Sequence, residues 1–185
     1  MSCCGIDQGC LQNGQDGAQL ERNRLRETAM NTDATLDLVL ERYVDVPVEQ
    51  VWAAWTQPSL LVQWFVPAPW KAVHAEVDLR PGGAFHTVME SPEGQQFPGT
   101  GCYLEVVAPS RLVWTSVMQG GFRPNVPGGT GPDFTCILTL TALGGGTIYR
   151  AEVQHATAEA AKAHADMGFH SGWSSALDQL VGLMG

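Results

Sequence analysis

Polar and apolar residues alternate along much of the chain with a period of two, the spacing of a strand with one buried face. Together with β-branched residues, this alternation predicts an opening strand over residues 35–44. Six further runs of this kind follow, at residues 72–79, 84–91, 101–108, 111–118, 134–141 and 147–154. Most connections between these runs are short and contain Gly, Pro or Ser. The predicted sheet is therefore antiparallel, because parallel strands need long crossovers.

Two short helices are predicted directly after the first strand. Pro47 ends the strand, and apolar side chains then recur at helical spacing over residues 48–57. Pro58 ends this helix and begins a second one over residues 58–65, which stops before Pro67 because proline cannot continue a helix.

The end of the chain predicts one long helix, with Thr157 as its N-cap and Glu159 in its first turn, ending near Leu183. A helical projection places one stripe of residues toward the sheet: Ala163, His170, Trp173, Leu177, Leu180, Val181 and Met184. No other predicted element is long enough to cover the apolar face of the sheet. The pattern predicts an α+β fold, a curved antiparallel sheet of about seven strands wrapped around a long C-terminal helix.

Composition favours a single domain without a nucleic-acid or membrane partner. The chain has 185 residues, of which 44% are apolar, enough for one core. Lys and Arg total 10 against 19 for Asp and Glu, and the formal charge of -9 repels phosphate backbones. Apolar runs are too short for a membrane span and no signal peptide is evident, so we expect a cytoplasmic protein. Residues 1–31 lack apolar periodicity and are expected to form a disordered tail before a domain over residues 32–185.

Two sets of side chains are candidates for a metal site. The first consists of soft ligands near the N-terminus, Cys3, Cys4 and Cys10. Adjacent cysteines serve a tetrahedral site poorly, and no fourth ligand follows at zinc-finger spacing. The second set lies on one predicted strand and its neighbour, His74, Glu76, Asp78 and His86. We interpret this second set as solvent-facing, with a metal site as the alternative, and expect no metal and no cofactor.

Several ordered segments resemble one family. They read VDVPVEQVWAAWTQPSLLVQWFVP, DLRPGGAFHTVM, GCYLEVVAPSRLVWTS, GGGTIYR and MGFHSGWSSALDQL. Over residues 35–183 the chain resembles the activator-of-heat-shock-protein-90-ATPase-like branch of the SRPBCC superfamily, which includes START and Bet v allergen-like proteins. The resemblance implies a helix-grip fold with a cavity between sheet and long helix, which in relatives takes lipids, sterols, polyketides or other apolar ligands. The eukaryotic activator engages its chaperone through a separate N-terminal domain, so a chaperone partner is not expected here.

The first functional hypothesis is therefore a binding protein for a small apolar or amphipathic ligand. Alternating strand positions, the helical stripe and Trp64 of the second short helix supply the predicted lining, with His170 as a polar anchor: Trp64, Phe85, Met89, Tyr103, Trp114, Met118, Phe134, His170, Trp173 and Leu177. Residues 119–133 are long for a hairpin connection, which is typical of a lid or of an exposed turn. As a lid, this segment would bring Phe122 to the cavity mouth and Arg123 to a ligand carboxylate.

Two further hypotheses stay open. Asp166 precedes His170 by one helical turn, a spacing at which a carboxylate can orient an imidazole as a general base. This pair predicts a metal-free cyclase, hydrolase or lyase of polyketide-like substrates. The third hypothesis is an interaction module that acts on a chaperone or as a homodimer, with Gly168 and Gly172 on the back of the long helix packed against a loop or second subunit.

Overall fold

The computed structural model describes residues 32–126 and 131–185. The fold described below is that of the unit Thr35–Gly185. The predicted tail and its three cysteines lie outside the described residues.

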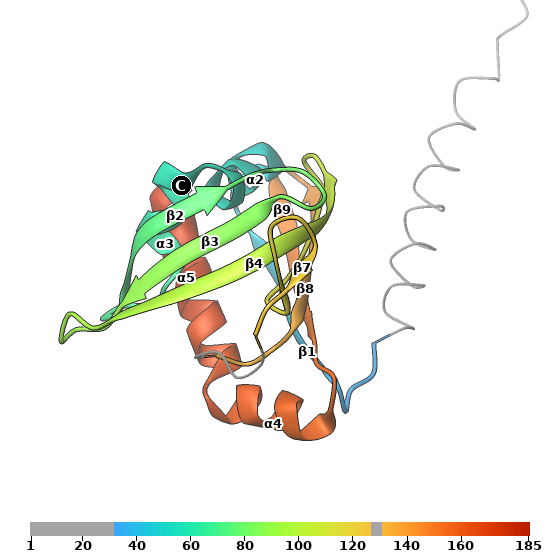
Figure 1. The fold of residues 1–185 in the computed structure, drawn as a ribbon. Helices are drawn as coiled ribbons and strands as arrows, with labels where there is room; N and C mark the ends of the chain where they lie inside the picture. The colour runs from blue at the N-terminus through green and yellow to red at the C-terminus, as the bar shows by residue number, and fades with distance from the viewer. Residues whose placement is uncertain (1–31, 127–130) are drawn as a thin grey trace, which may run out of the picture. The chain divides into compact units, whose positions relative to one another are not determined.

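Seven strands form one antiparallel sheet, as predicted (Figure 1). In spatial order they are β1 (Asp37–Val44), β9 (Gly146–Gln154), β8 (Thr135–Leu143), β5 (Arg111–Thr115), β4 (Gln96–Val107), β3 (Ala84–Glu90) and β2 (Lys71–Val77). Each neighbouring pair is antiparallel. The last strand returns to pair with the first, so β1 and β2 form the two edges.

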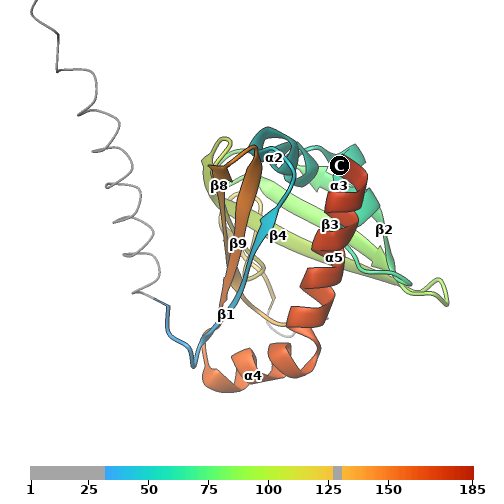
Figure 2. The same cartoon turned by 180° about the vertical axis from the view of Figure 1, so that it is seen from behind.

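The two short helices after β1 are also confirmed. They are α2 (Val48–Thr56) and α3 (Pro58–Trp64), and Pro58 occupies the first turn of α3, where its missing N–H leaves no helical hydrogen bond unmade. α3 packs on β2, and both helices contact α5 (Phe169–Met184). They therefore hold one end of α5 against the sheet (Figure 2).

The C-terminal helix is two helices rather than one, which corrects the sequence prediction. α4 (Ala158–Asp166) begins at the predicted N-cap Thr157, whose hydroxyl oxygen accepts a hydrogen bond from the Ala160 amide at 3.2 Å. The helical backbone is interrupted at Gly168, which has a left-handed conformation with φ of 94° that an α-helix does not accommodate. α5 starts directly after this residue and lies across one face of the sheet (Figure 2).

The break changes which residues of the predicted stripe face the sheet. Leu177 and Leu180 are fully buried, as predicted. Ala163 and His170 are exposed, because a single helical projection cannot relate residues on the two sides of the break.

We predicted that Gly168 and Gly172 pack closely against a loop or a second subunit, but the break gives Gly168 a different role. Gly168 adopts the left-handed backbone conformation found at the break, which glycine accommodates without strain. A Cβ atom on Gly172 would meet nothing nearer than Pro67 Cγ at 4.0 Å, which is an ordinary contact.

Two connections also differ from the sequence prediction. We predicted that this strand begins at residue 101, but β4 begins at Gln96. A tight turn joins it to β3, and within that turn the Ser91 amide donates to the Gln95 carbonyl at 2.9 Å. The predicted long loop after β5 contains a small two-stranded sheet of β6 (Met118–Gln119) and β7 (Arg123–Pro124). Gly144 and Gly145 form the turn between β8 and β9, and Gly146 begins β9.

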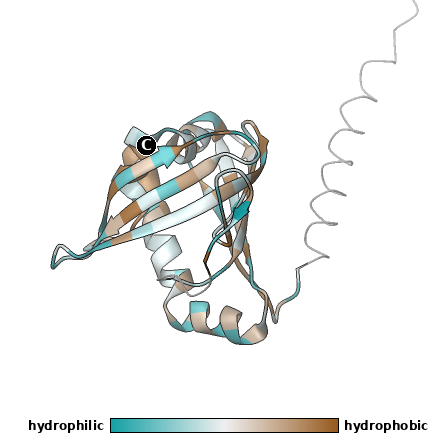
Figure 3. Cartoon of the chain, viewed as in Figure 1, coloured by the Kyte–Doolittle hydropathy of each residue, from teal (hydrophilic) through white to brown (hydrophobic). Residues whose placement is uncertain are grey.

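The core lies on the face of the sheet that is turned toward α5. Paired positions on four neighbouring strands place Leu40, Ala151, Leu138 and Leu112 in one row, and all four are buried. Hydrophobic and hydrophilic positions consequently alternate along the strands (Figure 3).

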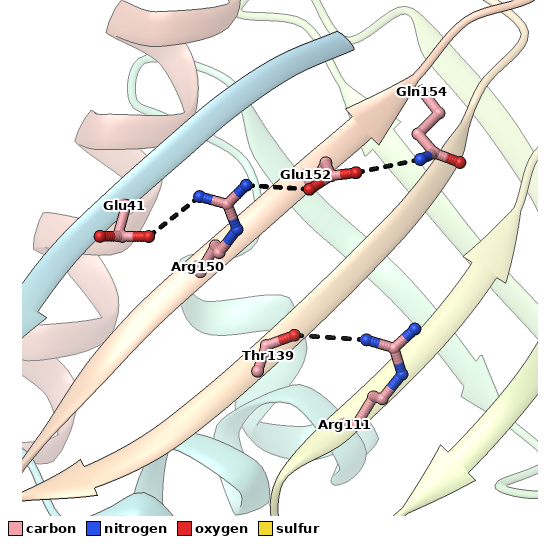
Figure 4. Close-up of polar contacts among 6 residues, drawn as sticks. All are labelled: Glu41, Arg111, Thr139, Arg150, Glu152 and Gln154. Carbon is pink, nitrogen blue, oxygen red and sulfur yellow. Dashed lines mark hydrogen bonds and ion pairs between the residues drawn. The ribbon is translucent and has the colours of Figure 1, made fainter. Parts of the chain in front are cut away.

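The opposite face of the sheet carries a chain of polar contacts (Figure 4). Arg150 on β9 donates to Glu41 on β1 and to Glu152 on β9, each at 2.9 Å. The Gln154 amide then donates to the second oxygen of Glu152 at 2.9 Å. Glu152 is buried, so its carboxylate is held by these donors rather than by bulk water alone.

Candidate functional site

Aromatic rings from neighbouring strands form a continuous surface on the core face of the sheet. Trp114 on β5 is paired with Tyr103 on β4, and Phe85 on β3 is paired with Gly101, so strand alternation points the three rings to the same side. Ring centroids are 5.5 Å apart for Tyr103 and Phe85, 4.8 Å for Phe85 and Trp114, and 5.1 Å for Trp114 and Phe134.

Helix α5 contributes two more rings to this surface. Phe169 and Trp173 have centroids 5.0 Å apart, and Trp173 lies 6.5 Å from Phe134. We call the six residues the ring cluster: Phe85, Tyr103, Trp114, Phe134, Phe169 and Trp173. Phe134 and Trp173 are half-buried, so the cluster reaches the surface where sheet and helix meet.

Three buried polar atoms around the ring cluster have no hydrogen-bond partner among the described residues: Trp55 Nε1, Trp114 Nε1 and Tyr103 Oη. Trp114 Nε1 lies near the Cys136 sulfur, and Trp55 Nε1 lies near the Tyr149 hydroxyl, but neither contact has hydrogen-bond geometry. Burial raises the pKa of Tyr103, so its hydroxyl stays protonated and can both donate and accept.

A buried pair of histidines borders the ring cluster. His155 follows β9, and its Nε2 lies 2.9 Å from Nδ1 of His164 on α4. The His155 Nδ1 atom lies 2.9 Å from the Leu36 carbonyl oxygen. The His164 ring contacts Phe134 and Phe169, with centroids 5.3 and 5.2 Å away. Burial and the neighbouring His155 lower the pKa of His164 to about 4, so this imidazole is neutral at physiological pH.

The histidine pair was not predicted from the sequence, because α4 and α5 were projected as one helix. A projection of α4 alone, starting at Thr157, places Ala161 and His164 three residues apart on one face, and both are buried. That spacing was the available signal. Nothing in the sequence pointed to His155 as the partner, because the pairing depends on where the end of β9 meets α4.

The structure does not form the predicted pair of Asp166 and His170. Asp166 lies at the end of α4, where its carboxylate accepts a hydrogen bond from Lys162 one turn earlier. His170 lies beyond the break at Gly168, and both Asp166 and His170 are exposed. The geometry that would make His170 an oriented general base, or an anchor facing the sheet, is therefore absent from the described residues.

The other predicted lining residues divide into two groups. Phe85, Tyr103, Trp114, Phe134 and Trp173 are brought together in the ring cluster. Leu177 and Trp64 belong to the same buried core as the ring cluster, whereas Met89 and Met118 are half-buried and lie outside that core. Trp64 has a structural hydrogen bond, since its Nε1 donates to the Ala54 carbonyl at 3.0 Å.

The predicted lid residues lie in the small β6–β7 sheet. Phe122 is 53% exposed, and its ring rests against Gly82 in the turn between β2 and β3. Arg123 is exposed and has no ion-pair partner among the residues placed by the structure. Within the described part of the chain, no ring pair joins Phe122 to the ring cluster, and no ion pair involves Arg123.

The alternative metal set does not gather into a site. His74 and His86 are neighbours, with ring centroids 5.8 Å apart, and His86 Nδ1 lies 3.4 Å from the Thr100 hydroxyl. Within residues 32–126 and 131–185, no three His, Cys, Asp or Glu side chains are placed to hold a metal ion. Over the same ranges, no helix combines the length and apolar character needed to cross a membrane.

The fold is that of an α+β protein of the helix-grip class, with an antiparallel sheet, the helix α5 that covers it and the two short helices α2 and α3. The chain belongs to the family described as Activator of Hsp90 ATPase homolog 1-like protein, whose model matches residues 45–185. This membership agrees with the SRPBCC resemblance that the sequence motifs indicated.

Solved structures of bacterial proteins share the fold. A Nitrosomonas europaea protein is 47% identical with a TM-score of 0.78, and the match covers 82% of this chain and 96% of that one. A Mycobacterium smegmatis protein is 30% identical with a TM-score of 0.68, covering 82% and 91%. A Rhodobacter sphaeroides protein is 25% identical with a TM-score of 0.70, covering 83% and 95%. No curated protein matches the chain.

Proposed function

We propose that the protein binds a small apolar or amphipathic molecule between the sheet and α5, against the ring cluster. The observation that carries this proposal is the Tyr103 hydroxyl, which is buried and lacks a partner among the described residues. An unpaired buried hydroxyl costs about 1–3 kcal/mol, so such groups are usually completed by a ligand or an ordered water. A polar atom of the ligand would supply the hydrogen-bond partner that the Tyr103 hydroxyl lacks.

The rings around Tyr103 supply the apolar part of the binding energy. Apolar burial contributes roughly 25 cal/mol per Å² of surface removed from water, and aromatic walls give a large contact area at low entropic cost. Phe134 and Trp173 are half-buried, so a ligand would enter beside them. This arrangement matches the general form of small-molecule sites, which combine a mostly apolar lining with a few polar groups.

The test uses the methyl ether of octylphenol, whose single oxygen can accept but not donate a hydrogen bond. We expect saturable one-to-one binding, measured by tryptophan fluorescence and native mass spectrometry. Tyr103→Phe should weaken this binding about five- to tenfold by removing one hydrogen bond. Tyr43→Phe is the matched control, because it removes a hydroxyl from a side chain that is 52% exposed.

Two results would contradict the proposal. The first is a wild-type protein that neither binds the ether nor carries a small molecule when purified from its own host. The second is an equal loss of affinity in Tyr103→Phe and Tyr43→Phe, which would show that the buried hydroxyl has no special part in binding.

A further inference from the structure

His164 lies at one end of the ring cluster, on the side away from Tyr103. Its side chain is 7% exposed, and its ring lies against Phe134 with an interplanar angle of 32°. From His164 the ring contacts lead through Phe134, Trp114 and Phe85 to Tyr103, with each pair of centroids between 4.8 and 5.5 Å apart. The two polar groups thus border the same aromatic surface at different ends.

Hydrogen bonds fix which nitrogen of His164 carries the proton. The Leu36 carbonyl can only accept, so Nδ1 of His155 must carry a hydrogen. In its neutral form His155 then has a bare Nε2, which accepts the hydrogen from Nδ1 of His164. His164 Nε2, on the other edge of that ring, is left unprotonated and without a partner among the described residues.

A neutral nitrogen of this kind is an acceptor only. The rings of His155, Phe134 and Phe169 contact the His164 ring, and among the described residues no ion pair joins it to a carboxylate. A bare nitrogen beside apolar rings favours a partner that brings its own hydrogen, and it gives nothing to a group that can only accept.

We propose that His164 Nε2 is a second anchor of the ligand site, accepting a hydrogen bond from a ligand hydroxyl. His155 is a positioning residue that fixes the tautomer. This inference rests on the proposed ligand site and specifies its ligand class: an elongated amphipathic alcohol or phenol, with its hydroxyl at His164 and an acceptor atom near Tyr103.

The alternative is that His155 and His164 have a purely structural role, because the hydrogen bond between them also joins α4 to the residue that follows β9. His164→Asn separates the two roles. The asparagine amide can place an N–H close to the position of Nδ1, so the tie to His155 is kept, while the acceptor at the Nε2 position is lost. His170→Asn is the matched control on an exposed histidine.

The experiment compares 4-(8-methoxyoctyl)phenol with its methyl ether on the full chain. Both probes carry an ether oxygen that can accept from Tyr103, and only the phenol brings a hydroxyl for His164. We expect the wild-type protein to bind the phenol about tenfold more tightly, the value of one neutral hydrogen bond. His164→Asn should reduce this preference to near unity while leaving the ether affinity unchanged, and His170→Asn should keep the wild-type preference. Long-range ¹⁵N–¹H spectra should show His164 as the tautomer protonated at Nδ1.

Equal affinity for both probes in the wild-type protein, with saturable binding of each, would overturn the His164 assignment and leave the ligand site standing. A phenol preference that survives in His164→Asn, or a tautomer protonated at Nε2, would overturn it as well. Failure of both probes to bind the wild-type protein would overturn the ligand site and this inference together.

Discussion

Arg42 on β1 reaches α5 and holds Asp178, with Nη2 and Oδ1 2.8 Å apart. The same guanidinium donates to the Ser174 carbonyl at 3.4 Å. This contact joins an edge strand of the sheet to the helix that covers the core. The Arg42 and Asp178 side chains are 37% and 64% exposed, so solvent weakens their attraction.

A double-mutant cycle should therefore give a small coupling energy between these two residues. We expect Arg42→Met and Asp178→Asn to couple by less than about 1 kcal/mol in urea unfolding, and the coupling should shrink further in high salt. Methionine keeps the aliphatic length of the arginine, so lost packing adds little. A coupling of several kcal/mol would show that α5 depends on this ion pair rather than on its buried leucines.

The two glycines of the C-terminal region should respond to alanine in opposite directions. Gly168→Ala should lower the free energy of unfolding by roughly 1–2 kcal/mol, because its φ of 94° is left-handed and alanine is strained there. Gly172→Ala should raise it by as much as about 1 kcal/mol, because Gly172 lies inside α5 and its Cβ position is open. Urea titrations of both variants test this. Equal destabilisation by both would mean that Gly172 also has a packing role.

The antiparallel sheet and its buried face were predictable because they follow from short-range patterns. Alternation along the strands is enough to place Phe85, Tyr103, Trp114 and Phe134 on one face. Pro47 and Pro58 marked the helix boundaries because proline acts on its own backbone. These signals need no knowledge of the rest of the chain.

The break at Gly168 was not predictable in the same way. A glycine inside a helical pattern is tolerated at a modest cost, so the sequence alone does not say whether the helix continues through it. In the structure α4 contacts β1 and α5, and the break at Gly168 reverses the roles of two histidines. His170 becomes exposed, while His164 is buried beside the ring cluster.

Among the charged residues on the outer face of the sheet, Arg150 should cause the largest loss of stability when it is replaced. Its partner Glu152 is 5% exposed, so Arg150→Met leaves a buried carboxylate without its cation. We expect a loss of roughly 2–4 kcal/mol in the free energy of unfolding. Glu41→Gln, which removes the charge of a partner with a side chain that is 54% exposed, should cost less than about 1 kcal/mol. Similar losses in both variants would contradict this difference between the buried and the exposed carboxylate.

His164 should make the stability of the protein fall with acid. Its folded pKa of about 4 is below the ordinary value of 6.5, so between these values the unfolded chain binds a proton that the folded protein does not. The stabilisation is fully present above pH 6.5 and is lost as the pH falls toward 4, at most by about 1.4 kcal/mol per pH unit. Carboxylates also titrate near the lower limit, so the measurement is the difference between wild-type and His164→Asn unfolding curves at each pH. That difference should change steadily across the window. A constant difference would show that His164 protonates equally in the folded and unfolded states, and that its ring is more open to water than its contacts with Phe134 and Phe169 indicate.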